Sequence, residues 1–127
     1  MIIRSAKDLI VYQRAYEQAM DIFHLTKAFP RDERYSLIDQ MRRSSRSVCA
    51  NLREAWAKRR YEAHFISKLS DADGENGEVE TWLDLARDCG YLGDAEHDKL
   101  IAINTEVGKM LGSMMALPDS FLLASDR

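Results

Sequence analysis

The stretch from Gln40 to Arg60 constrains the fold of this chain more than any other part of the sequence. Its apolar residues recur at steps of three and four, the spacing of one buried helical face (Met41, Val48, Leu52, Ala55 and Trp56). Small residues between them would let a second helix approach closely (Ser44, Ser45, Ser47 and Ala50). The stretch therefore predicts a long amphipathic helix that packs against other helices.

The rest of the chain repeats this pattern, and only two prolines, Pro30 and Pro118, interrupt it. Helices are predicted over residues 8–28, 32–57, 61–87 and 95–117, followed by a tail over 118–127. Four helices with three short connections give an all-α, antiparallel up-and-down four-helix bundle. The length of 127 residues corresponds to one domain, 1–127.

Local signals set the expected helix ends. Asp8, Asp32 or a neighbour, and Asp94 are the predicted N-terminal caps. Gly90 suits the left-handed residue that follows a helix end. Gly74 and Gly77 lie inside the third helix, where each costs about 1 kcal/mol relative to alanine. We therefore predict that these two glycines serve close packing.

The predicted helices have more apolar residues than their buried stripes need. The inward stripe of the first helix is predicted to be Tyr12, Ala15, Tyr16, Ala19, Ile22, Phe23 and Thr26. Further apolar residues fall outside the main stripes of the bundle (Ile10, Val11, Tyr61, Trp82, Leu85, Ile101 and Met115). This surplus favours a self-association face, and the alternative is a tilted helix that buries a wider arc.

Three asparagines are predicted to be structural polar residues of the core: Asn51, Asn76 and Asn104. A buried amide must find hydrogen-bond partners. We expect Asn76 to pair with a polar group on the second helix, either Asn51 or Ser45.

Charge is segregated along the chain, although the formal net charge is only -3. The second helix and the three residues that follow it contain the candidate nucleic-acid-binding residues, which are Arg42, Arg43, Arg46, Arg53, Lys58, Arg59 and Arg60. Glu54 is the one acid among them, whereas the segment from Asp71 to Asp98 contains ten acids and one base, Arg87. The basic helix of one subunit could meet the acidic helix of a neighbour, or it could stay open and bind phosphates.

No pattern in the sequence favours catalysis. A di-iron bundle needs paired Glu-x-x-His motifs, and Asp21 with His24 offers a single related pair. His64 and His97 stand alone, and no glycine-rich phosphate loop follows a strand. We expect no metal and no cofactor. The two cysteines, Cys49 and Cys89, are predicted to be buried free thiols, which suits the cytoplasm. No signal peptide or membrane-spanning segment is predicted.

An ordered series of short motifs from Asp8 to Leu117 resembles a known family. The opening Asp8-Leu9, Val11-Tyr12-Gln13 and Ala15-Tyr16 is followed by Phe29-Pro30, Glu33-Arg34-Tyr35 and Leu37. The central helix matches at Gln40-Met41-Arg42-Arg43-Ser44 and at Val48-Cys49-Ala50-Asn51-Leu52-Arg53-Glu54-Ala55. The end of the third helix matches at Leu83, Leu85-Ala86, Asp88 and Gly90-Tyr91-Leu92. The family comprises four-helix-bundle proteins first noticed in intervening sequences of bacterial 23S ribosomal RNA genes.

The resemblance implies a bacterial protein that assembles into a homopentameric ring. It also implies kinship with accessory proteins of diversity-generating retroelements, whose basic surface engages nucleic acid and a reverse transcriptase. Cys49 stands where the family usually has proline, and Ala55 where it usually has glycine. We expect Cys49 to leave the second helix straighter and Ala55 to leave slightly less room where this helix contacts another. Neither change should alter the fold.

Two functions follow as expectations. The first is a non-enzymatic, oligomeric scaffold that binds copies of itself and a protein partner. The alternative is an accessory protein that binds RNA or DNA without sequence specificity through the basic face of the second helix. The chain contains no motif that reads bases, so such binding would depend on shape and charge.

Overall fold

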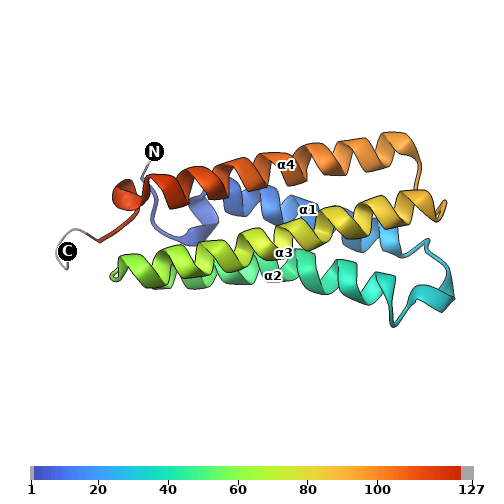
Figure 1. The fold of residues 1–127 in the computed structure, drawn as a ribbon, viewed down its shortest axis with the longest axis horizontal. Coiled ribbons are helices and arrows are strands. Elements are labelled where there is room, and N and C mark those ends of the chain that lie inside the picture. Colours follow the sequence, from blue (N-terminus) through green and yellow to red (C-terminus); the bar gives the residue numbers. More distant parts are fainter. Residues whose placement is uncertain (1, 124–127) are drawn as a thin grey trace.

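Four long helices run side by side, each antiparallel to the next (Figure 1). They are α1 (Ile10–Thr26), α2 (Leu37–Ala57), α3 (Glu62–Asp88) and α4 (Asp94–Ala116). Three 3-10 turns lie outside them: η1 (Ala6–Asp8), η2 (Arg31–Glu33) and η3 (Pro118–Ser120). This computed structural model describes residues 2–123, so residues 124–127 of the predicted tail lie outside the described part. The predicted all-α four-helix bundle is confirmed.

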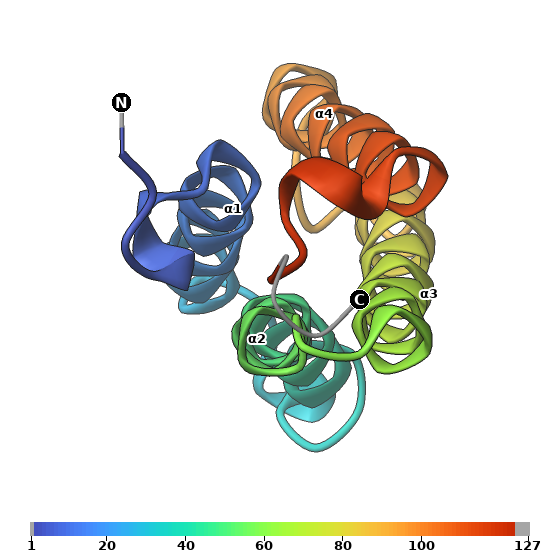
Figure 2. The same cartoon turned by 90° about the vertical axis from the view of Figure 1, so that its left-hand side faces the viewer.

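The view along the bundle shows the helices in chain order around a common core (Figure 2). Each helix packs against the next one in the sequence, and α4 returns beside α1. α1 therefore lies diagonally opposite α3, and α2 opposite α4. The turns η1 and η3 and the α2–α3 connection lie at one end of the bundle, whereas η2 and the α3–α4 connection lie at the other (Figure 1).

Two of the predicted helix starts are too early, because α1 begins at Ile10 instead of residue 8 and α2 begins at Leu37 instead of residue 32. Asp8 stabilises η1 instead of α1, because its carboxylate accepts the backbone N–H groups of Arg4 (2.8 Å) and Ser5 (3.2 Å). After Pro30 the chain forms η2, and α2 begins only at Leu37. The neighbouring acid Glu33 binds the hydroxyl of Ser36 and that of Tyr91, so tertiary contacts hold this segment outside the helix.

The α3–α4 connection follows its sequence signals more closely. Gly90 has φ 79°, and the backbone N–H of Tyr91 donates to the carbonyl of Ala86 at 2.9 Å, as expected for a glycine-terminated helix. The α4 cap is displaced by one residue from the prediction. Gly93 precedes the helix, Asp94 is its first residue, and Glu96 accepts the Gly93 N–H at 3.3 Å.

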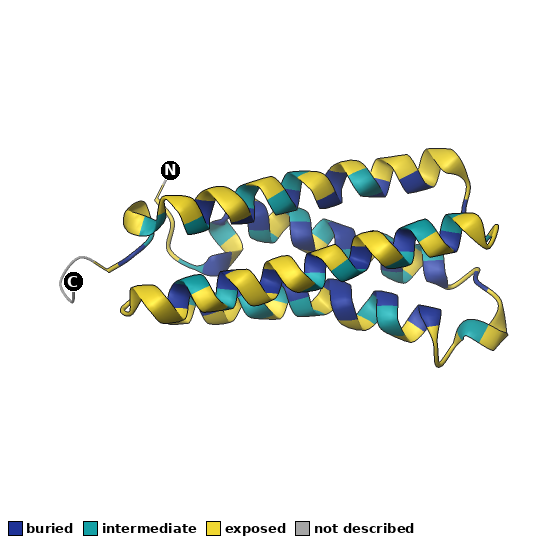
Figure 3. Ribbon diagram, viewed as in Figure 1, coloured by how far each residue is buried: buried dark blue, intermediate teal, exposed yellow. Residues whose placement is uncertain are grey.

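Buried residues line the inner side of every helix (Figure 3). They form two apolar clusters, one toward each end of the bundle. The cluster near the chain termini includes Val48, Phe65 and Val107, and the other includes Ile22, Met41 and Leu83. From the tail, Phe121 packs against the first cluster, with its ring centre 6.3 Å from that of Phe65.

A layer of three buried amides separates the two clusters. Gln18, Asn76 and Asn104 are at most 4% exposed and hydrogen-bond to one another from α1, α3 and α4. The prediction that Asn76 pairs with α2 is wrong. At that level α2 presents Ser45, which donates to the carbonyl of Arg42 on its own helix. Asn51 is half-buried and likewise donates to the carbonyl of Ser47.

The inward face of α1 is rotated from its predicted position. Its buried residues are Val11, Ala15, Gln18, Ile22 and Thr26. Two rows of apolar residues lie side by side on this helix, and periodicity alone could not decide which row faces the core. The row that contains Tyr12, Tyr16 and Phe23 lies beside α2 at the edge of the core, and Tyr16 is 54% exposed.

Candidate interaction surface on the α1–α2 face

Arg42 holds the C-terminal end of α1 against α2. Its Nε donates a hydrogen bond to the Thr26 hydroxyl (2.9 Å), and that hydroxyl donates to the Ile22 carbonyl (2.7 Å). The guanidinium also lies 4.9 Å from the centre of the Phe23 ring. A cation is favourable at this end of a helix, where unsatisfied carbonyls concentrate negative charge. Arg42, one of the predicted phosphate ligands, is therefore already bound within the subunit.

Arg43 is neutralised by acidic residues of α3 in the same chain. Its two terminal nitrogens bind Glu75 (3.1 Å) and Glu78 (2.8 Å). The sequence suggested a contact between the basic helix of one subunit and the acidic helix of another. For Arg43 this contact of opposite charges lies between α2 and α3 of one chain.

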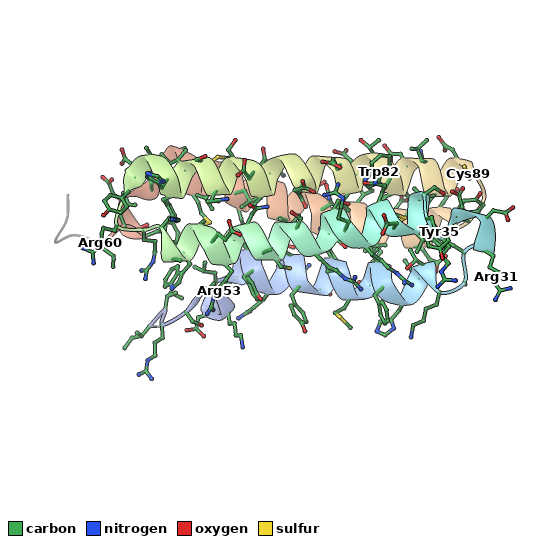
Figure 4. All side chains as sticks on the ribbon, turned by 90° about the horizontal axis from the view of Figure 1, so that it is seen from below. Arg31, Tyr35, Arg53, Arg60, Trp82 and Cys89 are labelled. Carbon is green, nitrogen blue, oxygen red and sulfur yellow. The ribbon has the colours of Figure 1, made fainter. Side chains whose placement is uncertain are left out.

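Arg59 covers the end of α2. Its guanidinium lies 3.5 Å from the centre of the Trp56 ring, and its Nε donates to the Trp56 carbonyl at 2.8 Å. Burial lowers the pKa of Arg59 from its ordinary value. Lys58 and Arg60 are exposed on either side of it, and Arg60 is labelled at this end of the bundle in Figure 4.

Arg46 and Arg53 differ from these three arginines. Both are exposed on α2, and neither makes an ion pair within residues 2–123. Figure 4 shows Arg53 on the side of α2 that borders α1, pointing away from the bundle. These two side chains are the predicted arginines that remain most available to a partner.

Arg46 forms part of a largely apolar groove between α1 and α2. The groove has a volume of about 350 Å³ and is lined by Tyr12, Tyr16, Ala19, Met20, Phe23, Arg46 and Cys49. Tyr16 is 54% exposed and Met20 39% exposed. Burial raises the pKa of the Cys49 thiol to about 11, so this thiol stays protonated at neutral pH. We call this surface the α1–α2 groove.

A second hollow adjoins the groove at the start of α2. It has a volume of about 520 Å³ and is lined by Arg34, Tyr35, Ile38, Asp39, Arg42, Arg43 and Arg46. Arg34 is not among the binding residues predicted from the sequence, because it precedes the basic stretch from Arg42 to Arg60, and in the structure it lies before the start of α2. Tyr35 is 83% exposed here and is labelled in Figure 4.

α3 presents an exposed surface of the opposite character. A row of small residues runs along it: Ala63, Ser67, Ser70, Gly74, Gly77 and Thr81. A methyl group added at Gly74 or Gly77 would meet nothing within 4 Å, so the prediction of close packing at these glycines is wrong within the subunit. Asp73 and Glu80 are exposed beside the row and make no ion pair within the described chain. We call this surface the α3 face.

The remaining candidate groups are arranged as follows. Asp21 and His24 line a hollow of about 360 Å³ between α1 and α4. In the described part of the chain, no group of three or more His, Cys, Asp or Glu side chains could hold a metal ion.

Two other predictions about single residues are wrong. Cys89 is exposed instead of buried. His97 does not stand alone, because it contacts Asp84, Asp98 and Arg87.

None of the helices within residues 2–123 has the length and apolar character that a membrane crossing requires.

Comparison with known proteins identifies the family of this bundle. No curated protein matches the chain. Among solved structures, it is similar to a protein of unknown function from the S23 ribosomal protein family of Bacteroides thetaiotaomicron. That structure aligns with a TM-score of 0.76 and 30% sequence identity, over 84% of this chain and 96% of the other. The model of the 23S rRNA-intervening sequence proteins matches residues 7–113, and the chain therefore belongs to the 23S rRNA-intervening sequence protein family.

Proposed function

We propose that this protein is a non-enzymatic interaction protein that works as a homo-oligomer, with its copies joined through the α1–α2 groove. The observation that carries the proposal is that Arg46 is exposed beside Tyr16 and Met20, which are exposed in the same groove. Arg53 is exposed further along α2, and neither arginine makes an ion pair within residues 2–123. Tyrosine, phenylalanine, methionine and arginine are the residue types that protein–protein interfaces favour over ordinary surface. The role is binding, and no catalytic residue, metal or cofactor forms part of it.

The α3 face of a second copy has the complementary character. Its small side chains would accept the protruding Tyr16 and Met20, and the exposed glycines would let the two surfaces approach closely. Its acids Asp73 and Glu80 would neutralise Arg46 and Arg53. The two surfaces differ, so the contact is head-to-tail, and repeating it closes a ring when the rotation per subunit allows. The family resemblance implies a pentamer, and we adopt that number for the ring.

The experiment is charge reversal at Arg46 in the groove and at Arg53 further along α2. In the double variant Arg46→Glu/Arg53→Glu, two carboxylates would face the acids of the neighbouring subunit. We expect multi-angle light scattering to give a smaller particle than the wild type, while the circular dichroism spectrum stays unchanged. Lys109→Glu is the matched control, because Lys109 is exposed on α4, which lies diagonally opposite α2. A double variant with the wild-type subunit number would refute the proposed interface.

A second candidate function is binding of RNA or DNA at the α2–α3 connection. Tyr61 is 58% exposed there, and its ring centre lies 5.6 Å from that of the exposed His64. Lys58 and Arg60 are exposed on the same connection. Aromatic rings can stack on unpaired bases while cations contact phosphates, which together give binding without sequence specificity. A ring-shaped oligomer would present several copies of this corner, so that one nucleic acid could contact more than one of them.

Binding to structured RNA and duplex DNA across a salt series tests this second function. We expect an affinity that falls steeply as salt rises, and a weaker affinity for Lys58→Glu and for Tyr61→Ala. Lys109→Glu again serves as the control. Absence of binding at low salt would leave the protein-interaction role alone. We place either activity in the cytoplasm, where free thiols such as Cys49 and Cys89 persist.

A further inference from the structure

His97 is a buried histidine in the first turns of α4, beside the end of α3. It is 5% exposed, although the segment around it is rich in exposed charged residues. Histidine is the side chain whose ordinary pKa lies closest to physiological pH, so a buried histidine among charges has more than one accessible state. Neither the oligomer interface nor the α2–α3 corner uses this residue.

Both ring nitrogens of His97 have partners on neighbouring turns. Nε2 lies 2.7 Å from a carboxylate oxygen of Asp84 on α3. Nδ1 lies 3.1 Å from a carboxylate oxygen of Asp98 and 3.3 Å from Nη1 of Arg87. Because Nε2 faces an acceptor, it carries a proton in the tautomer that this geometry favours.

The two partners of Nδ1 make opposite demands. A carboxylate accepts hydrogen bonds and needs a proton on Nδ1. A guanidinium only donates and needs the lone pair of an unprotonated Nδ1. Asp98 and Arg87 therefore cannot both hydrogen-bond to Nδ1 in one protonation state. The Asp98 side chain is 77% exposed and that of Arg87 is 35% exposed, so each can move away when the other is bound.

We propose that His97 is a pH-operated switch that changes partners between α3 and α4. In the protonated state its Nδ1–H binds Asp98 while Nε2–H binds Asp84, so the imidazolium lies between two carboxylates. When the Nδ1 proton leaves to solvent, the lone pair accepts a hydrogen bond from Arg87, and Asp98 turns to solvent. Asp84 is bound in both states, and the exchange takes place entirely at Nδ1.

The surrounding charges favour the protonated state. On α3 the nearby groups are Asp84, Arg87 and Asp88, and Arg87 also pairs with Asp88 at 3.1 Å. On α4 they are Asp94 and Asp98. The charged residues that α1 presents toward α4 are Asp21 and His24. They line a separate hollow together with Glu96 and Lys99, and His97 is not part of its lining. The hydrogen bond to Asp84, followed by that to Asp98, raises the pKa of His97, whereas burial and the charge of Arg87 oppose this rise.

The sign of the resulting pH dependence follows from that direction. A histidine whose pKa is higher in the folded state stabilises the fold below its unfolded pKa, near 6.5. This stabilisation is lost as the pH rises through the folded pKa. The switch lies next to the α3–α4 connection, where the Tyr91 hydroxyl donates to Glu33 of η2 at 2.7 Å. Protonation of His97, as the pH falls toward 6.5, would therefore stabilise this end of the bundle.

The test is a nuclear magnetic resonance titration of all three histidines in the full chain, which reports both pKa and tautomer through the ring nitrogen shifts. His24 and His64 are exposed and serve as internal references. We expect the pKa of His97 to lie above the ordinary value of histidine, and the neutral ring to carry its proton on Nε2. We also expect the carboxyl carbon of Asp98 to shift with the same midpoint as His97.

Two variants test the opposing effects of Asp98 and Arg87 on His97 without removing the histidine. Asp98→Asn should lower the pKa of His97, because the acceptor for Nδ1–H loses its charge. Arg87→Gln should raise that pKa, because the competing cation is removed. An unchanged pKa in both variants would overturn the proposal, and so would a neutral His97 with its proton on Nδ1. Lys109→Glu should leave the titration unchanged.

Discussion

Asn76 and Asn104 exchange hydrogen bonds across the α3–α4 contact. The side-chain amide of each donates to the backbone carbonyl of the other, at 3.0 and 2.9 Å. Gln18 joins this pair from α1, accepting from Asn104 at 2.9 Å and donating to the Asn76 side-chain oxygen at 3.2 Å. Sliding α4 along α3 by one turn would break these bonds and leave polar groups unpaired between two apolar clusters. The amide layer therefore specifies the register of the bundle.

Replacing Asn76 with leucine should destabilise the subunit by about 1–3 kcal/mol, because the Gln18 and Asn104 amides would each lose a buried partner. The matched control is Asn51→Leu, since Asn51 is half-buried and bonds only to Ser47 of its own helix. Urea unfolding curves measure both. Equal stability of Asn76→Leu and the wild type would show that the layer has no role in stability.

Arg42 and Arg46 lie one turn apart on α2 but should respond differently to truncation. Arg42→Ala removes the hydrogen bond to Thr26 and the contact with Phe23, so we expect a loss of about 1–2 kcal/mol in the free energy of unfolding. Arg46→Ala removes no hydrogen bond or ion pair within residues 2–123 and should change the free energy of unfolding by less than about 0.5 kcal/mol. Thermal unfolding of dissociated samples compares the stability of the two variants. An equal loss of stability in Arg42→Ala and Arg46→Ala would contradict the different roles of these two arginines.

Gly77→Ala should have opposite effects on the subunit and on the oligomer. The added methyl group meets nothing within 4 Å in the subunit, so the better helix propensity should stabilise it by about 1 kcal/mol. In the proposed assembly the same methyl group would hinder the close approach of a neighbour. The gain in subunit stability is measured by urea unfolding of Gly77→Ala in the Arg46→Glu/Arg53→Glu background. The weaker assembly is measured in the otherwise wild-type chain, as the protein concentration at which the oligomer dissociates. Stabilisation with unchanged dissociation would place the interface elsewhere.

Tyr91→Phe should change how stability depends on pH. Hydrogen bonds from Ser36 and then from Tyr91 lower the pKa of Glu33, so their contribution exists above the unfolded pKa of Glu33 and is lost as the pH falls through the folded value. The bond to Glu33 also raises the pKa of Tyr91 to about 12. The contribution is therefore also lost above pH 10, where the unfolded tyrosine ionises. We expect the difference in melting temperature between wild type and variant to be largest between these limits, and a constant difference would contradict this.

The sequence predicts the fold well because the deciding signals are local. Gly90 marks the end of α3 because glycine adopts the left-handed conformation freely. Pro30 and Pro118 mark boundaries for the opposite reason, because proline restricts the backbone and lacks the N–H group that a helix needs. Helix starts near Asp8 and Asp32 were misplaced because tertiary contacts of Glu33 and a local turn at Asp8 compete with helix capping. On α1, two parallel apolar rows satisfy the same period. The choice between them depends on Gln18, which joins the core only because Asn76 and Asn104 complete its hydrogen bonds.

The candidate surface was less predictable from sequence. Arg42, Arg43 and Arg46 are equivalent by residue type and proximity, yet the first binds Thr26, the second binds two α3 acids, and the third is exposed. The three arginines differ because each side chain faces a different neighbouring group. The number and spacing of charges in the sequence do not show which group each side chain faces. The open space at Gly74 and Gly77 could not be predicted for the same reason, because a helical glycine indicates close approach without showing whether the partner belongs to the same chain.

Sedimentation velocity on a charge-swap series tests the proposed head-to-tail interface most directly. Arg46→Glu/Arg53→Glu and, separately, Asp73→Lys/Glu80→Lys should each give smaller particles than the wild type, because each places like charges across the contact. The chain with all four substitutions restores opposite charges, and we predict that it recovers the wild-type sedimentation coefficient. If the four-substitution chain stays dissociated, or if either pair alone leaves the oligomer intact, the α1–α2 groove and the α3 face are not partners.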